Sequence, residues 1–516
     1  MKKRFMAVFL CSLLAASLTG CSYKGIDSVT DLIPASSGKA TIEESEETAE
    51  DLYTKSDYDT SYDDYKTITL ADSASSCDSK NVDIDGDVIN INSAGTYLIS
   101  GSLSDGQIVV NAENEKVHLV LDGTSISNSS AACIYVKQAD KVFITTAKGS
   151  ENSLLSSGEF EQTDDNNVDG TIFSKADLTL NGEGSLSVIC ENEHAIVSKD
   201  DLVITSGTYT ISASEGKGLQ GKDSVRIGGG DISVMDCYEG IEGLEIYITG
   251  GNIDITSSDD GINAVNKDSD DETAKMMGDD SCILAISGGF ININAGGDGI
   301  DSNGSVTVTG GETYVSGAAD GGNAALDYGT SATVTGGIFV AAGFSQMACN
   351  FGDDSTQGAI LYTFSETVNG AVTARLLDAD GNEIISYTPP KEYNSILFSV
   401  PEIKEGNDYT VTAGSLSESI TMDGLIYGGG SGFGMGGGFG GHNGEMKGAM
   451  GDPGGENFDP DNLPEGFENI TPGVMPDGIP EGEGNMPGGG AMPGGGKERR
   501  SGNAGEKTAP SDGSSL

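Results

Sequence analysis

The stretch Tyr238–Thr256 decides the fold, and it reads YEGIEGLEIYITGGNIDIT. Four related strings lie around it: E-G-K-G-L-Q from Glu215, D-G-I-N-A-V from Asp260, D-G-I-D-S-N from Asp298 and D-G-G-N-A-A from Asp320. The glycines at equivalent places are 22, 21, 38 and 22 residues apart: Gly218, Gly240, Gly261, Gly299 and Gly321. A unit of about 22 residues therefore repeats, and the interval of 38 residues adds a polar loop over 267–280.

Apolar and polar residues alternate within each unit, on both sides of a Gly-Gly pair. In I-Y-I-T-G-G-N-I-D-I-T, from Ile246, the alternation puts four isoleucines on one face of the strands. Three short strands per unit and no helical segment predict an all-β fold, a parallel β-helix with coils of about 22 residues over 76–343. A β-sandwich or a propeller is the alternative, but those folds need two-residue hairpins or blades of about 40 residues.

The segments that flank the repeat have a different composition. Residues 344–427 lose the period and are predicted to form a small antiparallel β module that caps the end of the helix. Residues 428–516 are rich in Gly, Pro and Met, and residues 21–75 are polar and acidic. Both of these segments are predicted to be disordered tails.

The N-terminus has the features of an exported lipoprotein. Three basic residues at 2–4 precede a short apolar run that ends in L-T-G-C at 18–21, a string that resembles a lipobox. The run is shorter than the about 20 residues of a transmembrane helix, so residues 1–20 are predicted to be a signal peptide. Cleavage would leave Cys21 as the lipidated N-terminus of an extracellular protein anchored to the membrane at the cell surface.

The charge of the chain excludes one class of partner. The sequence contains 27 Lys and Arg and 80 Asp and Glu, which gives a formal net charge of −53. So negative a protein repels phosphate groups, so we expect no nucleic acid as partner and no membrane contact besides the lipid anchor. Cations are the complementary partners.

The six cysteines that follow Cys21 are predicted to be mostly free, buried thiols. They include no C-x-x-C motif, which argues against a zinc site or a thioredoxin-type site. In the repeat, Cys190 and Cys237 end strands that are two coils apart. Their separation of about 10 Å would exceed the reach of a disulfide.

Several strings resemble one known family, in order along the chain. They are A-G-T-Y-L-I-S-G from Ala94, D-G-Q-I-V-V from Asp105, L-V-L-D-G from Leu119, D-L-T-L-N-G-E-G-S-L from Asp177 and the D-G-I coils. Over about 80–425 the chain is similar to the bacterial carbohydrate-binding domain-containing proteins, which are lipoproteins of anaerobic Gram-positive bacteria. The resemblance implies a right-handed parallel β-helix, related in shape to pectate lyases, that binds Ca²⁺ and recognises cellulose or acidic pectic sugars without demonstrated catalysis. It does not supply ligand-binding residues.

The register of the repeat stacks acidic residues in two columns at the first turn of the coils. Carboxylates about 4.8 Å apart repel by about 3.5 kcal/mol at an effective dielectric constant of about 20, so a partly buried column needs a cation. Ca²⁺ fits because it accepts carboxylate, amide and carbonyl oxygens in loose geometry. The alternative is a set of solvated turns in an acidic protein. The predicted ligands are Glu239, Asp260, Asp298 and Asp320 in one column, Glu242, Asn263, Asp301 and Asn323 in the other, and Asp259 beside the first.

These observations favour a non-catalytic protein that binds an acidic or cellulosic polysaccharide. The chain has no Trp, so a ring that stacks on sugar would have to be a tyrosine, and Tyr238, Tyr247 and Tyr314 are the candidates. An anionic protein would need Ca²⁺ as a bridge to an anionic polymer of uronic acid.

Two alternative functions stay open. A Ca²⁺-dependent polysaccharide lyase of the pectate-lyase type needs a basic side chain that accepts a proton. The other alternative is a structural surface spacer or adhesin. A hydrolase with paired carboxylates and a histidine is disfavoured, since the three histidines lie in unrelated contexts. The candidate bases of a lyase are Lys217, Lys222, Arg226, Lys267 and Lys275, of which Lys267 and Lys275 lie in the polar loop.

Overall fold

The computed structural model describes residues 52–267, 269 and 278–429. Within these ranges every regular element is a β-strand, which confirms the all-β class, and no helix could span a membrane. The predicted signal peptide with Cys21, the first part of the predicted tether, Lys275, and all but the first two residues of the predicted C-terminal tail lie outside the described residues.

The strands up to residue 343 belong to the repeat and its N-terminal extension. They are β1 (Lys66–Leu70), β2 (Ser76–Cys77), β3 (Val82–Asp85), β4 (Val88–Ile91), β5 (Gly95–Leu103), β6 (Gln107–Asn111), β7 (Lys116–Asn128), β8 (Ile134–Gln138), β9 (Lys141–Thr146), β10 (Glu151–Ser156), β11 (Gly170–Ser174), β12 (Asp177–Gly182), β13 (Ser185–Cys190), β14 (His194–Ser198), β15 (Asp201–Ile204), β16 (Thr208–Ile227), β17 (Asp231–Ser257), β18 (Ile262–Ala264), β19 (Ile283–Ala295), β20 (Ile300–Ser302), β21 (Ser305–Val308), β22 (Glu312–Ser316), β23 (Ser331–Val334) and β24 (Ile338–Gly343).

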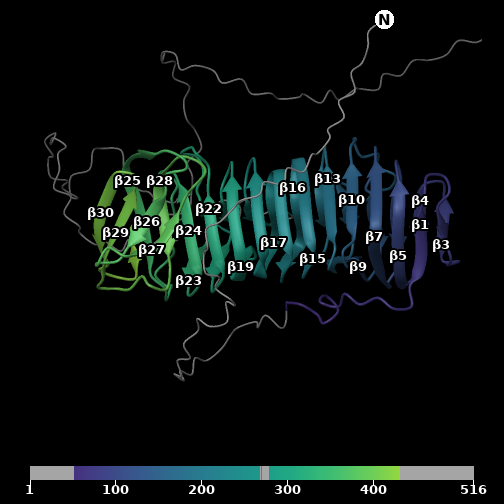
Figure 1. The fold of residues 1–516 in the computed structure, drawn as a ribbon, viewed down its shortest axis with the longest axis horizontal. Coiled ribbons are helices and arrows are strands. Elements are labelled where there is room, and N and C mark those ends of the chain that lie inside the picture. The colour runs from purple at the N-terminus through teal and green to yellow at the C-terminus, as the bar shows by residue number, and fades with distance from the viewer. Residues whose placement is uncertain (1–51, 268, 270–277, 430–516) are drawn as a thin grey trace, which may run out of the picture. The chain divides into compact units, whose positions relative to one another are not determined.

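Strands β2 and β3 pair antiparallel with β1 and β4. The other strands pair in three parallel ladders, so that each segment lies beside the segment one repeat earlier and one repeat later. One ladder runs through β7, β9, β12, β15, β16, β17, β19, β21 and β23. A second runs through β6, β8, β11, β14, β16, β17, β18 and β20. The third joins β7, β10, β13, β16 and β17, and then β17, β19, β22 and β24. Figure 1 shows β5, β7, β10, β13 and β16 following one another in this stacking order.

Apolar residues of successive repeats stack in the interior. One such column contains Ile196, Leu219, Ile241, Ile262 and Ile300, which pair in register and are all completely buried. The alternation around Ile246 is as predicted, because Ile246, Ile248, Ile253 and Ile255 are buried while the residues between them are more exposed. The isoleucine faces of the strands therefore form the interior.

The six cysteines in the described part of the chain are free, and all but Cys77 are buried. Cys190 pairs with Ala213, and Ala213 pairs with Cys237, so the two cysteines are separated by a whole coil. This confirms the prediction that they do not form a disulfide.

The C-terminal strands pair antiparallel, except β31, which pairs in parallel with β25. Strand β28 pairs antiparallel with β24, the last strand of the third ladder, and with β25 on its other side. A separate sheet has the order β27-β26-β29-β30. The bounds are β25 (Ala359–Val368), β26 (Ala374–Leu377), β27 (Glu383–Tyr387), β28 (Tyr393–Ser399), β29 (Asp408–Ala413), β30 (Leu416–Thr421) and β31 (Ile426–Tyr427).

The N-terminal side requires a correction. Residues 66–75 were predicted to belong to a disordered tether, but β1 pairs in parallel with β5 and so adds a strand to the first ladder. Residues 52–65, which we call the strap, also have a defined position, because Asp57 is buried and forms an ion pair with Lys141 at 2.8 Å. Polar composition predicted disorder here, but polar partners on the coils hold the segment.

Candidate metal centre

The second ladder places polar side chains directly after its buried apolar column. Glu242 pairs with Asn263, and Asn263 pairs with Asp301. Each follows an isoleucine that is completely buried, at positions 241, 262 and 300. The inward isoleucine fixes the outward direction of the residue after it, so these polar side chains line up from coil to coil.

A second column lies at the turn that precedes each of these strands. The backbone N–H of Gly240 donates to Asp260 O at 3.0 Å, and that of Gly261 donates to Asp298 O at 2.9 Å. Glu239, Asp260 and Asp298 are thus at equivalent places in three successive coils, as predicted.

Three carboxylates from the two columns converge. Asp260, Asp298 and Asp301 each offer an oxygen atom, and these oxygen atoms all lie within 4.8 Å of one another. The backbone N–H of Asp298 donates to Asp260 Oδ1 at 2.8 Å, and the backbone N–H of Ala324 donates to Asp298 Oδ1. These bonds hold the first two carboxylates in place and leave other oxygen atoms of the triad for a ligand.

The amide of Asn263 adds an acceptor to this group. Its Nδ2 donates to Asp260 Oδ2 at 3.4 Å, while its Oδ1 is buried and has no hydrogen-bond partner. A buried acceptor without a partner is costly, and a bound cation would satisfy it.

Burial and mutual repulsion make the three carboxylates difficult to ionise together. Burial, followed by the charge of neighbouring carboxylates, raises the pKa of Asp260 to about 6, of Asp298 to about 7 and of Asp301 to about 8. A cation among them would remove the repulsion and favour the ionised forms.

The dimensions and the donor set fit Ca²⁺. Two oxygen atoms bound to one Ca²⁺ at about 2.4 Å each can be at most about 4.8 Å apart, which is the limit within which the triad lies. Gly297 leaves room at the same place, since a Cβ built there would lie 2.5 Å from Asp259 Oδ1 and 2.6 Å from Asp260 Oδ1. Asp260, Asp298, Asp301 and Asn263 would therefore hold the ion, with Asp259 beside them.

Glu239 and Glu242 belong to a neighbouring ion-pair network. Glu242 Oε2 lies 2.7 Å from the Nζ of Lys217 and 2.7 Å from that of Lys267, and Lys217 Nζ lies 3.8 Å from Glu239 Oε2. Burial opposes ionisation of Glu242, but Glu239 and the two lysines lower its pKa to about 2. Burial and Glu242 raise the pKa of Glu239 to about 8. The lysines neutralise this pair, so it is a poorer cation site than the aspartate triad.

Asp320 and Asn323 do not join the columns, and this part of the predicted ligand set is wrong. Asp320 is exposed, and its Oδ1 accepts hydrogen bonds from Gly322 N at 2.8 Å and from Asn323 Nδ2 at 3.4 Å within one turn. The bridge from Ile300 to Leu326 instead brings Asp327 next to Asp301 in the second column. Burial raises the pKa of Asp327, as in the triad.

The sequence contains a pattern that could have predicted Asp327, but the alignment on the D-G strings does not include it. Leu326-Asp327 repeats the apolar-acidic pair of Ile300-Asp301, four residues after the place that the D-G alignment gives. The last coil contains extra residues in this turn, so the buried column determines the register better than the glycine does.

Of the three candidate tyrosines, only Tyr238 lies beside the triad. It is 47% exposed, and the neighbouring Asp259 carboxylate raises the pKa of Tyr238 to about 12. Tyr247 lies on the first ladder and donates to Glu245 Oε2 at 2.9 Å. Tyr314 lies on the third ladder, where its ring is 5.7 Å from that of Phe290.

The structure also separates the candidate bases of a lyase. Lys267 lies next to the triad, but its pairing with Glu242 outweighs the effect of burial and raises its pKa. Arg226 lies on the first ladder, where it pairs with Asp201 Oδ2 at 3.1 Å and donates to Leu52 O at 3.3 Å. Lys222 is exposed, and Lys275 lies outside the described residues.

The fold and the site thus define an all-β protein of stacked parallel strands with an acidic, oxygen-rich centre on one edge. Residues 85–273 match the family described as "Carbohydrate-binding domain-containing protein". A protein of the same description from Acetivibrio thermocellus is 40% identical over 128 residues, which are 24% of this chain and 45% of the relative. The chain therefore spans less than half the length of that relative. Both comparisons name the family that the sequence resembles, so the similarity to that family is confirmed for the matched region.

One solved structure is also similar. It is named "Structure of the polysaccharide lyase-like protein from C. thermocellum, Gadolinium derivative" and is 28% identical. The similarity covers 52% of this chain and 97% of that chain, with a TM-score of 0.38.

Proposed function

We propose that the protein binds polysaccharide through Ca²⁺ held by Asp260, Asp298 and Asp301, without catalysis. The observation that carries the proposal is the convergence of the three carboxylates within 4.8 Å. The family of residues 85–273 supports a carbohydrate as the partner. In this role, Ca²⁺ supplies positive charge to bind a uronate carboxylate, and the three aspartates hold the ion.

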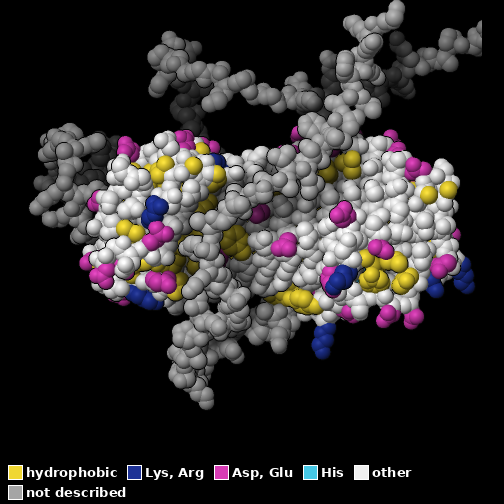
Figure 2. All heavy atoms as spheres, viewed as in Figure 1, with side chains coloured by type: hydrophobic (Ala, Val, Ile, Leu, Met, Phe, Trp, Pro, Cys, Tyr) yellow, Lys and Arg dark blue, Asp and Glu magenta, His cyan; other side chains and the backbone are white. Residues whose placement is uncertain are grey.

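An acidic polymer is the partner that this arrangement suits best. The chain has a net charge of −53, and Figure 2 shows Asp and Glu side chains scattered over the visible face with few Lys and Arg. Such a surface would repel polygalacturonate unless cations bridge the two. Tyr238, exposed beside Asp259, offers a ring face to a sugar held at the centre.

The proposal includes the finer description of the fold and the location. The three parallel ladders with a repeat near 22 residues support a right-handed parallel β-helix, as the resemblance implies. The lipobox-like string that ends at Cys21 supports an extracellular lipoprotein at the cell surface.

The test is retention on polygalacturonate by the protein and by Asp298→Ala/Asp301→Ala. We expect the parent protein to be retained with Ca²⁺ and released by chelator, and the variant not to be retained. The β-sheet circular dichroism should not change, because removing like charges relieves repulsion. Asp320→Ala is the matched control, since Asp320 lies outside the centre, and it should be retained. Equal retention of parent and double variant would contradict the proposal.

A Ca²⁺-dependent lyase is the second candidate, because Lys267 lies beside the triad. Its raised pKa favours the charged ammonium, which cannot accept a proton. Absorbance of unsaturated products, measured in the same incubation, separates the two functions. Release of such products by the parent, and loss of this release in Lys267→Ala, would establish the lyase. If the parent neither binds the polymer nor releases products, a structural spacer is favoured.

A further inference from the structure

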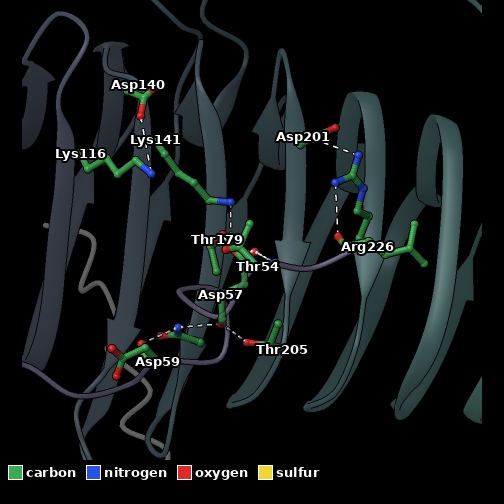
Figure 3. Close-up of polar contacts among 12 residues, drawn as sticks. Thr54, Asp57, Asp59, Lys116, Asp140, Lys141, Thr179, Asp201, Thr205 and Arg226 are labelled. Carbon is green, nitrogen blue, oxygen red and sulfur yellow. Dashed lines mark hydrogen bonds and ion pairs between the residues drawn. The ribbon is translucent and has the colours of Figure 1, made fainter. Parts of the chain in front are cut away.

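A cavity lies several coils away from the aspartate triad, where the strap crosses the first ladder. It has a volume of about 270 Å³, and residues of the strap and of β5, β7 and β9 line it. Figure 3 shows Asp57 of the strap turned towards Lys141, with Asp59 farther along the strap and Lys116 turned towards Asp140. The lining residues used below are Ser56, Asp59, Thr96, Lys116, His118 and Phe143.

A chain of hydrogen bonds behind the cavity fixes the orientation of Asn181. Its Nδ2 donates to the backbone oxygen atoms of Asp57 at 3.0 Å and of Asp59 at 3.2 Å. Its Oδ1 therefore faces the other way and accepts the hydroxyl of Thr145 at 2.5 Å. The single hydroxyl hydrogen of Thr145 is used in that bond.

This chain determines which nitrogen of His118 carries the proton. Nε2 lies 2.7 Å from Thr145 Oγ1, and since that oxygen has no further hydrogen to donate, Nε2 must be the donor. Burial lowers the pKa of His118, which favours the neutral ring. In a neutral imidazole Nδ1 is then a bare acceptor, and no described residue donates to it.

The remaining polar groups complement a sugar hydroxyl pattern. Asp59 Oδ1 accepts from Ser61 N at 3.0 Å and from Ser61 Oγ at 2.6 Å, which leaves Oδ2 for another donor. Lys116 is exposed at the rim, and its ammonium group pairs with Asp140 Oδ2 at 3.8 Å, so we assign it no contact with a ligand. Phe143 adds an apolar surface, with His118 at 6.1 Å between ring centroids. Two acceptors beside an apolar wall are typical of a saccharide subsite.

The size and charge of the cavity limit the ligand. A volume of 270 Å³ equals the liquid volume of roughly nine waters at about 30 Å³ each, which is enough for one sugar ring. Asp59 contributes a carboxylate to the lining, while the ammonium of Lys116 is paired with Asp140, so the cavity disfavours an anionic ligand. A uronate would place its carboxylate among the acceptors Asp59 Oδ2 and His118 Nδ1, whereas hydroxyl groups can donate to both.

We propose that this cavity is a second, metal-independent saccharide subsite that binds one uncharged pyranose ring. The strap supplies Ser56 and Asp59 and the coils supply the rest, so the subsite is complete only with the strap in place. A bound ring would therefore hold the strap on the coils. The subsite is separate from the proposed metal centre, and neither depends on the other.

The test is titration of the full chain with methyl β-glucoside and with cellobiose, followed by NMR or calorimetry in the presence of chelator. We expect saturable binding in the millimolar range, at least tenfold weaker binding by Asp59→Asn and by His118→Phe, and slower amide hydrogen exchange of residues 52–61 with ligand. Asp279→Asn is the matched control, because Asp279 accepts from Ser281 N at 2.9 Å and Oγ at 2.6 Å in the same kind of turn, and it should bind as the parent does.

Two results of this titration would overturn the proposal. One is absence of saturable binding by the parent in chelator, and the other is parental affinity in both cavity variants while their thermal transitions show them to be folded. Tighter binding of galacturonate than of the glucoside would equally refute an uncharged ligand. Because the titration contains chelator, the proposed Ca²⁺ centre does not contribute to it. Failure of the Ca²⁺ centre and failure of this subsite are therefore distinguishable.

Discussion

At the scale of single residues, the glycines of the repeat permit close approach between coils. A Cβ at Gly240 would lie 2.3 Å from Gly261 O, and a Cβ at Gly261 would lie 2.5 Å from Gly299 O. No positive φ occurs at these glycines, so contact rather than backbone conformation requires them. The D-G string thus marks the place where carbonyl oxygens of one coil meet the next, and it brings the neighbouring carboxylates close together.

Gly297 provides a residue-scale test of the metal centre. In Gly297→Ala the new methyl group would displace the carboxylates of Asp259 and Asp260, whose Oδ1 atoms lie 2.5 and 2.6 Å from the Cβ position. We expect at least tenfold weaker Ca²⁺ binding, about 1.4 kcal/mol, with little change in the melting temperature of the metal-free protein. Calorimetric titration measures the affinity. Gly322→Ala is the control, since its Cβ would meet only Asp320 Oδ1 at 3.5 Å, and a similar loss there would contradict the assigned site.

The candidate ligands show how far the sequence alone predicts a site. Asp260, Asp298 and Asp301 were found because their coils keep the same number of residues between the D-G turn and the buried isoleucine. The last coil does not, so Asn323 was chosen where Asp327 belongs. The lysines that neutralise Glu242 could not be predicted, because they come from separate segments of the chain.

At the scale of elements, the ladders were predictable and the strap was not. Alternating isoleucines define each coil strand, since one face must be buried. The strap has no such alternation, and specific polar bonds hold it. Thr179 Oγ1 donates to Asp57 Oδ1 at 2.6 Å, and Thr205 Oγ1 donates to Asp57 O at 2.5 Å. Such contacts depend on the finished coils, so composition alone predicts disorder.

Removal of Asp57 should release the strap without unfolding the coils. In Asp57→Ala the buried ammonium of Lys141 loses its partner at 2.8 Å, which costs about 3–5 kcal/mol for a buried ion pair. We expect rapid proteolysis within residues 52–65 and a nearly unchanged β-sheet circular dichroism spectrum. Lys148→Ala removes the exposed ion pair with Glu183 and should not change the proteolysis pattern. Protection of the strap in Asp57→Ala equal to that of the parent would show that the ion pair does not hold it.

At the scale of the whole molecule, each coil contacts mainly its neighbours. The ladders join each segment to the repeat before and after it, so stability is passed along the stack from coil to coil. The proposed metal centre joins the coils that contain Asp260 and Asp298. The strap joins the coils before them, from Lys141, Thr179 and Thr205 as far as Thr249 of β17, whose hydroxyl lies 3.0 Å from that of Tyr53. The two sets of contacts therefore follow one another along one stack.

Chelation should accordingly destabilise one part of the stack. If Ca²⁺ is present at about 100 times its dissociation constant, its removal lowers the free energy of unfolding of the coils it joins by about 2.7 kcal/mol. We expect a lower melting temperature and faster amide hydrogen exchange in β18 and β20, because the repulsion among the three aspartates is no longer neutralised. Exchange in β7 and β9 should not change, since these strands lie several coils away. Asp298→Ala/Asp301→Ala is the control, and chelator should not alter its melting temperature. An unchanged melting temperature of the parent would contradict the metal centre, and uniform faster exchange in all four strands would contradict coil-by-coil coupling.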